Sequence, residues 1–233
     1  MTPISLSKEM LSLKLADIWQ VLTPEQQNYL YDQALVRRYA KGDMLYEEGQ
    51  SAEYLMAVLT GCVKIYKEGH KTRIQILRLV IPGQYFGYRA RFVEESYVTS
   101  ASCLKPTEIC LVPMVCIERL VNQNLSLAKL FIRLLSRDLV ACDSRSISLT
   151  QSHIRGRLAE TLIFLAYAYG TCPDNITLSV ELSREDLAAL SNMTTANAIR
   201  TLSSFQSEGL ISIHGRAIRL NDAPKLRLLA QNG

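Results

Sequence analysis

The sequence of 233 residues lacks the patterns that mark several large classes of protein. It has no run of about eighteen apolar residues, so no membrane-spanning helix is expected. Its first ten residues, MTPISLSKEM, do not place a charged segment before an apolar one, as a secretion signal would. These absences lead us to expect a cytoplasmic protein.

The cysteines are spaced too widely for a familiar metal site. No CxxC pair occurs, and no histidine lies close enough in the sequence to complete a zinc site, so we assign no metal ligands. In a reducing compartment such thiols pack mostly as small apolar residues. The six are Cys62, Cys103, Cys110, Cys116, Cys142 and Cys172.

Familiar catalytic motifs are missing as well. The sequence contains no GxSxG elbow, P-loop, HExxH or GxGxxG, so an enzyme is a weak alternative and no catalytic residue is assigned. The net charge of +4, from 26 Lys and Arg against 22 Asp and Glu, is too small to argue for nucleic acid alone. A nucleic-acid interface must therefore be argued from local geometry.

Residues 182–220 provide that geometry, because they are typical of two short helices followed by a hairpin. Ser183 is placed to cap a helix over about 184–190, with acidic residues in its first turn. Thr194 is placed to cap a second helix that runs to about Ser207, and Gly209 follows where a helix stops. This pattern predicts a helix-turn-helix whose second helix can lie in the DNA major groove.

A short hairpin follows the two helices. Residues 211–213 and 217–220 alternate around the turn His214-Gly215-Arg216, which is typical of the wing of a winged helix. Arg216 is expected to touch DNA phosphates from the wing, and Ser183 and Arg184 from the start of the first helix. A solvated helix face in an all-helical domain is the alternative interpretation.

The second helix carries side chains suited to reading bases. Asparagine can hydrogen-bond adenine, arginine guanine, and threonine can touch the thymine methyl group. We expect Ile199, Leu202 and Phe205 to point inward. The residues expected on the outward face are Thr194, Thr195, Asn197, Arg200 and Thr201.

The segment from Val36 to Pro113 has the two-residue period of strands, with glycines at intervals that suit turns. Many short strands with turns every 8–12 residues or so predict a sandwich or barrel-like roll. A helix from Pro24 to about Gln33 precedes it, since Thr23 and Gln26 have the spacing of a capping box.

A long helix is predicted from about Ser126 to Leu149. Its apolar stripe is too long for one roll to cover, so we expect it to pair with its copy in a second subunit; a helix lying wholly on its own roll is the alternative. The residues expected at the pairing face are Leu127, Leu130, Phe131, Leu134 and Ala141. The polar residues 150–152 then mark a domain boundary, and Arg155 and Arg157 begin the next helix.

Four stretches, in the right order and over nearly the whole chain, resemble the CRP/FNR family of bacterial transcription regulators. They are residues 41–67, PGQYFG (82–87), HIRGRLAETL (153–162) and residues 182–202. The resemblance implies an α+β fold: a double-stranded β-roll like that of cyclic-nucleotide-binding domains, a long dimerisation helix and a winged helix-turn-helix. The expected ranges are 1–123 for the effector-sensing roll, 124–150 for the helix and 151–233 for the DNA-binding domain.

The resemblance also implies partners. It implies a homodimer joined along the long helix, double-stranded DNA with two half-sites, RNA polymerase, and a small effector held between roll and long helix. The family's DNA-reading positions fall on Thr194, Thr195, Ala196, Asn197 and Arg200 of this sequence. Arg200 matches a common arginine, but Thr195 and Ala196 stand where well-known members carry an Arg-Glu pair or a glutamate. The operator is therefore expected to differ from theirs.

The implied effector pocket departs further from the family. Cyclic-nucleotide binders use a Gly-Glu pair for the ribose and an Arg-Ser pair for the phosphate. Here Tyr88 replaces the acid and Thr99 the arginine, and losing a fixed cation weakens phosphate binding strongly. We therefore expect an effector other than cyclic AMP, of unknown identity. The candidate pocket residues are Gly87, Tyr88, Arg89, Thr99, Ser100, Cys142 and Asp143.

Two further alternatives stay open. Iron–sulfur members bind their cluster near the N-terminus, whereas the first cysteine here is Cys62, so that mode is not expected. Haem held through a cysteine, such as Cys103 or Cys142, is not excluded by the sequence. The second alternative function is a ligand-sensing or haem- or redox-sensing module whose winged helix binds protein instead of DNA.

Overall fold

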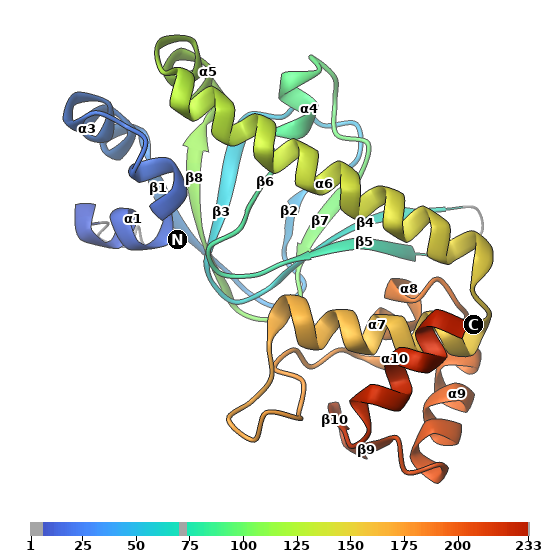
Figure 1. Cartoon of the computed structure of the whole chain (residues 1–233). Helices are drawn as coiled ribbons and strands as arrows, with labels where there is room; N and C mark the ends of the chain where they lie inside the picture. The colour runs from blue at the N-terminus through green and yellow to red at the C-terminus, as the bar shows by residue number, and fades with distance from the viewer. Residues whose placement is uncertain (1–6, 70–73, 233) are drawn as a thin grey trace. The chain divides into compact units, whose positions relative to one another are not determined.

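The computed structural model describes residues 7–69 and 74–232, and the side chains of all but a few of these (Figure 1). The chain divides into two compact units. The first is built around the β-rich segment and the beginning of the long helix, up to Val140, and the second contains the chain from Ala141 onward. None of the helices in the described residues is long and apolar enough to cross a membrane.

Three short helices open the first unit: α1 (Lys8–Lys14), α2 (Ala16–Trp19) and α3 (Pro24–Gln33). The predicted capping box of α3 is confirmed. The Gln26 backbone N–H donates to Thr23 Oγ1 at 3.3 Å, and the Thr23 N–H donates to Gln26 Oε1 at 3.2 Å. These reciprocal bonds satisfy two groups that a helix start leaves without partners.

Two antiparallel four-stranded sheets form the predicted roll. The first has the order β1-β8-β3-β6 and the second β2-β7-β4-β5. The strands are β1 (Leu35–Tyr39), β2 (Met44–Tyr46), β3 (Tyr54–Thr60), β4 (Val63–Glu68), β5 (Ile74–Val80), β6 (Tyr85–Phe86), β7 (Ser100–Cys103) and β8 (Thr107–Pro113).

Strand β3 is buried on both faces, because alternate side chains enter two different cores. Leu55 and Ala57 join the core shared with the N-terminal helices, while Met56 and Val58 fill the inside of the roll. Its neighbour β8 divides its residues in the same way, which places a double layer of apolar side chains at the centre of the unit.

Helices α4 (Arg89–Phe92), α5 (Met114–Gln123) and the long α6 (Leu125–Gln151) complete this part of the chain. Leu127, Leu130 and Phe131 of α6 are buried in the core of their own roll, and Leu134 packs against it. The structure thus corrects the expected pairing face, since these side chains are already covered by their own chain. Of the residues named for that face, Ala141 is exposed.

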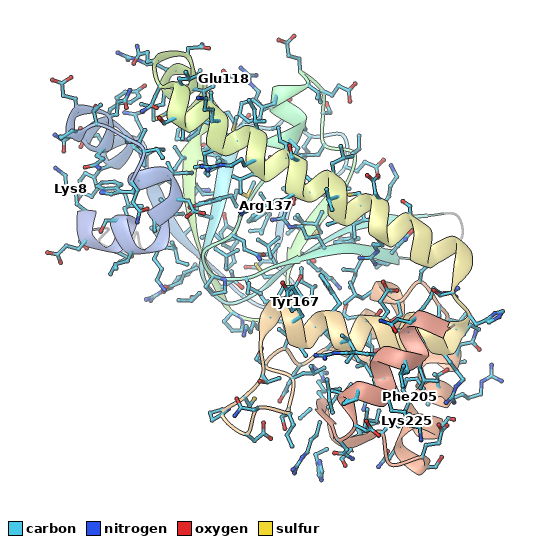
Figure 2. All side chains as sticks on the ribbon, viewed as in Figure 1. Lys8, Glu118, Arg137, Tyr167, Phe205 and Lys225 are labelled. Atoms are coloured by element: carbon cyan, nitrogen blue, oxygen red, sulfur yellow. The ribbon has the colours of Figure 1, made fainter. Side chains whose placement is uncertain are left out.

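The second unit contains the predicted helix-turn-helix and wing. Its elements are α7 (Ile154–Tyr169), α8 (Arg184–Leu190), α9 (Thr195–Ser207), β9 (Ile211–His214), β10 (Ala217–Leu220) and α10 (Ala223–Asn232). Strands β9 and β10 pair antiparallel, with Ile211 opposite Leu220. Phe205 of α9 is fully buried and lies among the helices of this unit (Figure 2).

Gly61 gives a direct test of how tightly the roll is closed. Its φ of +95° favours glycine, and an added Cβ would lie 2.6 Å from the Thr107 Cα and 2.7 Å from the Pro106 carbonyl oxygen. We expect Gly61→Ala to lower the free energy of unfolding by about 3 kcal/mol, because strain and overlap add. Urea unfolding followed by circular dichroism measures it.

Gly83 supplies the matched control, since its φ is +86° but an added Cβ meets nothing within 4 Å. Gly83→Ala should cost only about 1 kcal/mol, from strain alone. Equal losses in the two variants would contradict the close approach at Gly61.

Candidate nucleic-acid interface

Helix α8 begins as the sequence predicts. The Ser183 hydroxyl accepts the Asp186 backbone N–H at 3.0 Å and donates to the Asp186 carboxylate at 2.9 Å. Both bonds fix the first turn of α8, where the unpaired backbone N–H groups favour anions.

Arg184 has a partner that the sequence did not predict. Its Nη2 donates to the Gly215 carbonyl oxygen at 2.9 Å, and Gly215 lies at the tip of the β9–β10 hairpin. Arg184 therefore ties the start of α8 to the wing, while Arg216, the next residue of the turn, is exposed. The wing and the first helix are held together as one surface.

Helix α9 is capped by Thr194, whose hydroxyl accepts the Asn197 backbone N–H at 3.2 Å. On the exposed side of the same helix, Arg200 Nη2 donates to Asn197 Oδ1 at 2.6 Å. The structure thus brings two predicted base-reading residues together, with Thr195 half-buried beside them in the first turn. This bond takes one of the two lone pairs of Asn197 Oδ1 and leaves its NH2 donors and the second lone pair available for a base.

The inward face of α9 differs from the sequence prediction at two positions. Ile199 is 47% exposed, and Thr201, expected outside, is only 8% exposed. The buried residues are Ala198, Thr201, Leu202 and Phe205. Their spacing of three, four and seven residues follows the 3.6-residue period, whereas Ile199 is turned about 100° from Ala198. Ile199 is therefore an exposed apolar residue in the middle of the polar face.

The two arginines at the start of α7 are held by the protein itself. Arg155 donates to Ser204 Oγ at 2.6 Å and to Glu208 Oε2 at 2.9 Å, and it lies over the Phe205 ring at 4.9 Å. Arg157 donates to the Ser152 carbonyl oxygen at 2.9 Å. Arg155 thus links the start of α7 to the end of α9, which fixes the direction of the second helix of the motif.

This link predicts a pH effect. The hydrogen bond from Arg155, helped by Ser204, lowers the pKa of the Glu208 carboxyl below its ordinary value of 4.5. Because the folded pKa is the lower one, the ionised pair stabilises the fold above pH 4.5, and this stabilisation is lost as the pH falls through the folded pKa. The pair is partly exposed, so the contribution is less than about 1 kcal/mol.

Arg155→Gln should return the Glu208 pKa toward 4.5, read from the side-chain carboxyl carbon in an NMR titration. Arg216→Gln, on the exposed wing, is the control and should leave the midpoint unchanged. A Glu208 midpoint unaltered by Arg155→Gln would show that this contact does not set its pKa.

The candidate effector residues on the roll lie on the turn between β6 and α4. Gly87 has φ +85°, and a Cβ there would lie 2.7 Å from the Tyr54 carbonyl oxygen. Tyr88 is 1% exposed and packs edge-on against Phe92 and Phe131. Burial, followed by the nearby Asp138 carboxylate, raises the pKa of the Tyr88 phenol, so it stays neutral. The aromatic ring thus packs against side chains of α4 and α6.

The other candidate effector residues have different surroundings. Thr99 hydrogen-bonds Tyr46, and the Ser100 hydroxyl accepts the Glu48 backbone N–H at 3.1 Å. Cys142 and Asp143 are exposed on α6, in the other compact unit. Within the first unit, Gly87 and Tyr88 lead directly into α4 at Arg89, and Tyr46 interacts with both Thr99 and Arg89.

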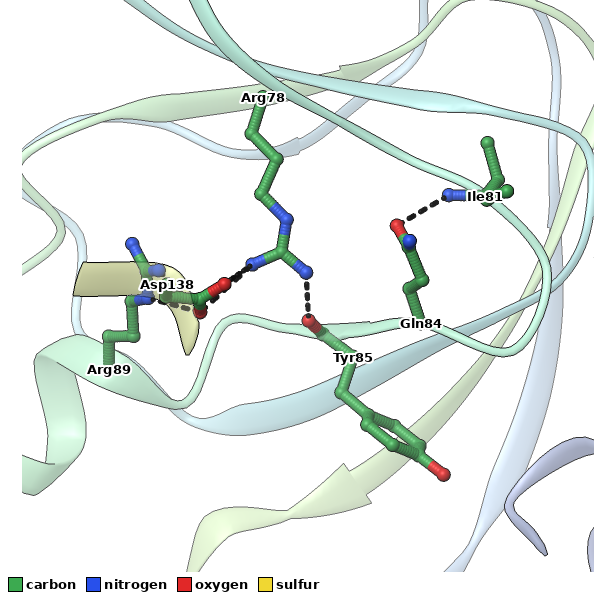
Figure 3. A network of polar contacts seen from close by, with 6 residues as sticks. All are labelled: Arg78, Ile81, Gln84, Tyr85, Arg89 and Asp138. Carbon is green, nitrogen blue, oxygen red and sulfur yellow. Dashed lines mark hydrogen bonds and ion pairs between the residues drawn. The ribbon is translucent and has the colours of Figure 1, made fainter. Parts of the chain in front are cut away.

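Arg89 points to a residue that the sequence analysis missed. Its Nε donates to Asp138 Oδ2 at 3.1 Å, and Arg78 Nη1 donates to both Asp138 oxygens at 3.3 and 3.2 Å (Figure 3). Arg78 Nη2 also donates to the Tyr85 carbonyl oxygen at 3.1 Å. Asp138 lies 49 and 60 residues from its partners and in no motif, so no signal in the sequence marked it.

The cysteines named as possible haem ligands have contrasting environments. Cys103 is buried in the roll, and burial raises the pKa of its thiol to about 11, which keeps it protonated near neutral pH and makes it a poor ligand. Cys142 is exposed. In the part of the chain that the structure describes, no group of three His, Cys, Asp or Glu side chains could hold a metal ion.

Two models of known domain families match the chain, one in the roll and one in the helix-turn-helix unit. The model of the cyclic nucleotide-binding domain matches residues 36–124, and that of the Crp-like helix-turn-helix domain matches residues 156–229. The transcriptional regulatory protein btr of Bordetella pertussis is 30% identical over 193 residues, which cover 82% of this chain and 79% of btr. The chain belongs to the CRP/FNR family of transcription regulators.

Family membership accounts for the order of roll, long helix and helix-turn-helix, and it makes the chain a regulator, not an enzyme. The structure of FixK2 from Bradyrhizobium japonicum has the same fold, with a TM-score of 0.77 at 24% identity, covering 84% of this chain and 96% of that one. The CRP-like cAMP-activated global transcriptional regulator of Mycobacterium tuberculosis is 22% identical over 92% of this chain and 96% of its own length. At that distance, the cyclic AMP in the name of that regulator describes that protein and does not assign an effector to this chain.

Proposed function

We propose that this CRP/FNR regulator is a homodimer that reads a two-fold symmetric DNA site with α9 of each subunit. The observation that carries the proposal is the outer surface of the capped helix α9, where Ile199 and Arg200 are exposed and Thr195 and Asn197 are half-buried at the borders of the buried face. These side chains offer an amide, a guanidinium, a hydroxyl and an apolar group, which together suit base edges and a thymine methyl group.

Phosphate contacts would complete the interface. The exposed Arg216 of the wing and the N-terminus of α8 at Ser183 are suited to binding phosphates, while Arg184 keeps wing and helix in register through Gly215. RNA polymerase is the partner we infer for the bound dimer, because transcription regulators of this family act on it.

Binding-site selection from random duplexes, followed by alanine variants, tests the reading face. Arg200→Ala and Ile199→Ala should each cost about 1–3 kcal/mol on the selected site and relax the preference at one position of each half-site. Arg216→Ala should weaken binding to all DNA sequences by a similar factor. It should also reduce the slope of log affinity against log salt concentration by about one.

Gln206→Ala, exposed on the C-terminal part of α9, is the matched control and should bind like the parent. If Arg200→Ala, Ile199→Ala and Gln206→Ala all select the parent's site and bind it as well as the parent does, α9 is not the reading helix. Binding that does not weaken as salt rises would instead favour a winged helix that recognises protein, since phosphate contacts release counterions.

The dimer is inferred from the outer face of α6. Three of its exposed apolar residues repeat every seven positions, with three small or apolar residues between them, as in a coiled-coil seam. The first set is 70%, 61% and 63% exposed: Leu125, Ile132 and Leu139. The second set comprises Ala128, Leu135 and Cys142, of which Cys142 is exposed, Ala128 is half-buried, and Leu135 is half-buried and also packs against the core of its own roll. A second copy of α6 would cover this face.

The seam predicts two linked outcomes. Ile132→Asp with Leu139→Asp should convert dimer to monomer, because like charges would face each other in an apolar seam. Analytical ultracentrifugation measures the mass, with Val115→Asp, an exposed apolar-to-acid change on α5, as the control. A double variant that stays dimeric would place the interface elsewhere.

Cys142 provides a native probe of the same seam. It lies in register with Leu135 and is exposed, so a short bismaleimide should join two chains of the parent protein and none of Cys142→Ser. Cross-linking that persists in Cys142→Ser, and so uses another thiol, would contradict the register.

The roll supports an effector other than cyclic AMP. The buried Tyr88 ring occupies the turn where an acid would meet the ribose, and Thr99 offers a hydroxyl already bonded to Tyr46 where a cation would meet the phosphate. Neither Tyr88 nor Thr99 is a cation that could meet a cyclic phosphate, and charge-assisted hydrogen bonds are the stronger ones in such recognition.

A further inference from the structure

Asp138 is a single carboxylate that holds two guanidinium groups from two other elements. Arg78 comes from β5, Arg89 from α4 and Asp138 from the middle of α6, and all three belong to the first compact unit. Figure 3 shows the two arginines converging on the carboxylate from different directions, with Arg78 also anchored on the Tyr85 carbonyl oxygen. The cluster connects the long helix to the roll at a point beyond the buried Phe131.

The surroundings make this contact stronger than an ordinary surface pair. The side chains of Arg78, Arg89 and Asp138 are 26%, 47% and 21% exposed, so the carboxylate is largely screened from water. Tyr88 lies beside it as a neutral, buried phenol. Partial burial strengthens an ion pair and raises the cost of leaving either member unpaired.

The carboxylate of the cluster is shared by two guanidinium groups. Two positive groups face one negative group, whereas the neighbouring Arg91 of α4 pairs one-to-one with Glu118 of α5. Two guanidiniums aimed at one carboxylate are an arrangement that can bind the carboxylate of a ligand. Here the carboxylate comes from the chain itself.

We propose that Arg78 and Arg89 form a carboxylate-binding site that Asp138 fills from within the chain. The internal carboxylate takes the place of an effector's anionic group and fixes α6 on the roll without one. This inference rests on the DNA-binding function proposed above. If Asp138 fixes α6 on the roll, the regulator needs no anionic effector in order to bind DNA. Removing the Asp138 carboxylate opens the site to a small free carboxylate.

The test uses Asp138→Ala and sodium formate. Formate supplies a free carboxylate that is not covalently attached to α6. Hydrogen exchange of the amides in residues 125–140 reports whether α6 is docked, and operator affinity reports the consequence. Formate replaces chloride at constant ionic strength, because salt alone weakens DNA binding. We expect Asp138→Ala to speed exchange and weaken operator binding roughly tenfold, the effect of losing charged hydrogen bonds, and formate to reverse both.

Two controls isolate the site. Asp32→Asn removes one exposed negative charge from the same unit and should behave as the parent. Asp138→Ala with Arg78→Gln should not respond to formate, since one of the two binding groups is gone. Near-parental exchange in Asp138→Ala, no response to formate, or an equal response in the double variant would each overturn the proposal.

The exchange measurement also separates this proposal from the function that it rests on. If the parent binds no DNA, the proposed function fails, while the formate response of α6 still decides whether the carboxylate site exists.

Discussion

Helix α6 is apolar on two faces, and one chain can cover only one of them. Leu127, Leu130 and Phe131 are buried in the core of their own roll. Ile132 and Leu139, on the other side, remain more than half exposed. Burying such side chains contributes about 1.5–3 kcal/mol each, so the open face is a strong reason for a second chain to bind.

The inner face of α6 is held by a polar contact as well as by packing. Phe131 packs against Tyr88, and two turns later Asp138 receives Arg78 and Arg89. The packing alone fixes the helix along one edge, whereas the carboxylate fixes its rotation, because the hydrogen bonds have direction. The roll thus holds two guanidinium groups that are occupied by the protein's own carboxylate.

The sequence predicted the parts of the fold that depend on local signals. The capping box at Thr23 and the caps at Ser183 and Thr194 lie where they were expected, because each acts over three residues. The faces of the helices were harder to predict. Ile199 fits a three-residue spacing with Leu202, but the 3.6-residue period turns it outward and brings Thr201 in. In α6 the apolar residues that the sequence pattern singled out are the ones that face the roll. The exposed apolar residues of the proposed seam lie on another face of the helix and were not predicted.

Contacts between distant residues were beyond the sequence. The sequence around Asp138 does not indicate a partner 60 residues away. The sequence around Arg155 likewise does not indicate its ion pair with Glu208. Such pairs appear only after the sheet and helices have placed their ends together.

The number of chains on one operator tests the central claim most directly. Native mass spectrometry of the complex with the selected duplex should show two chains per site, and a duplex cut to one half-site should lose most of the affinity. One chain per duplex, with undiminished affinity for the half-site, would contradict a regulator that is built around the outer face of α6.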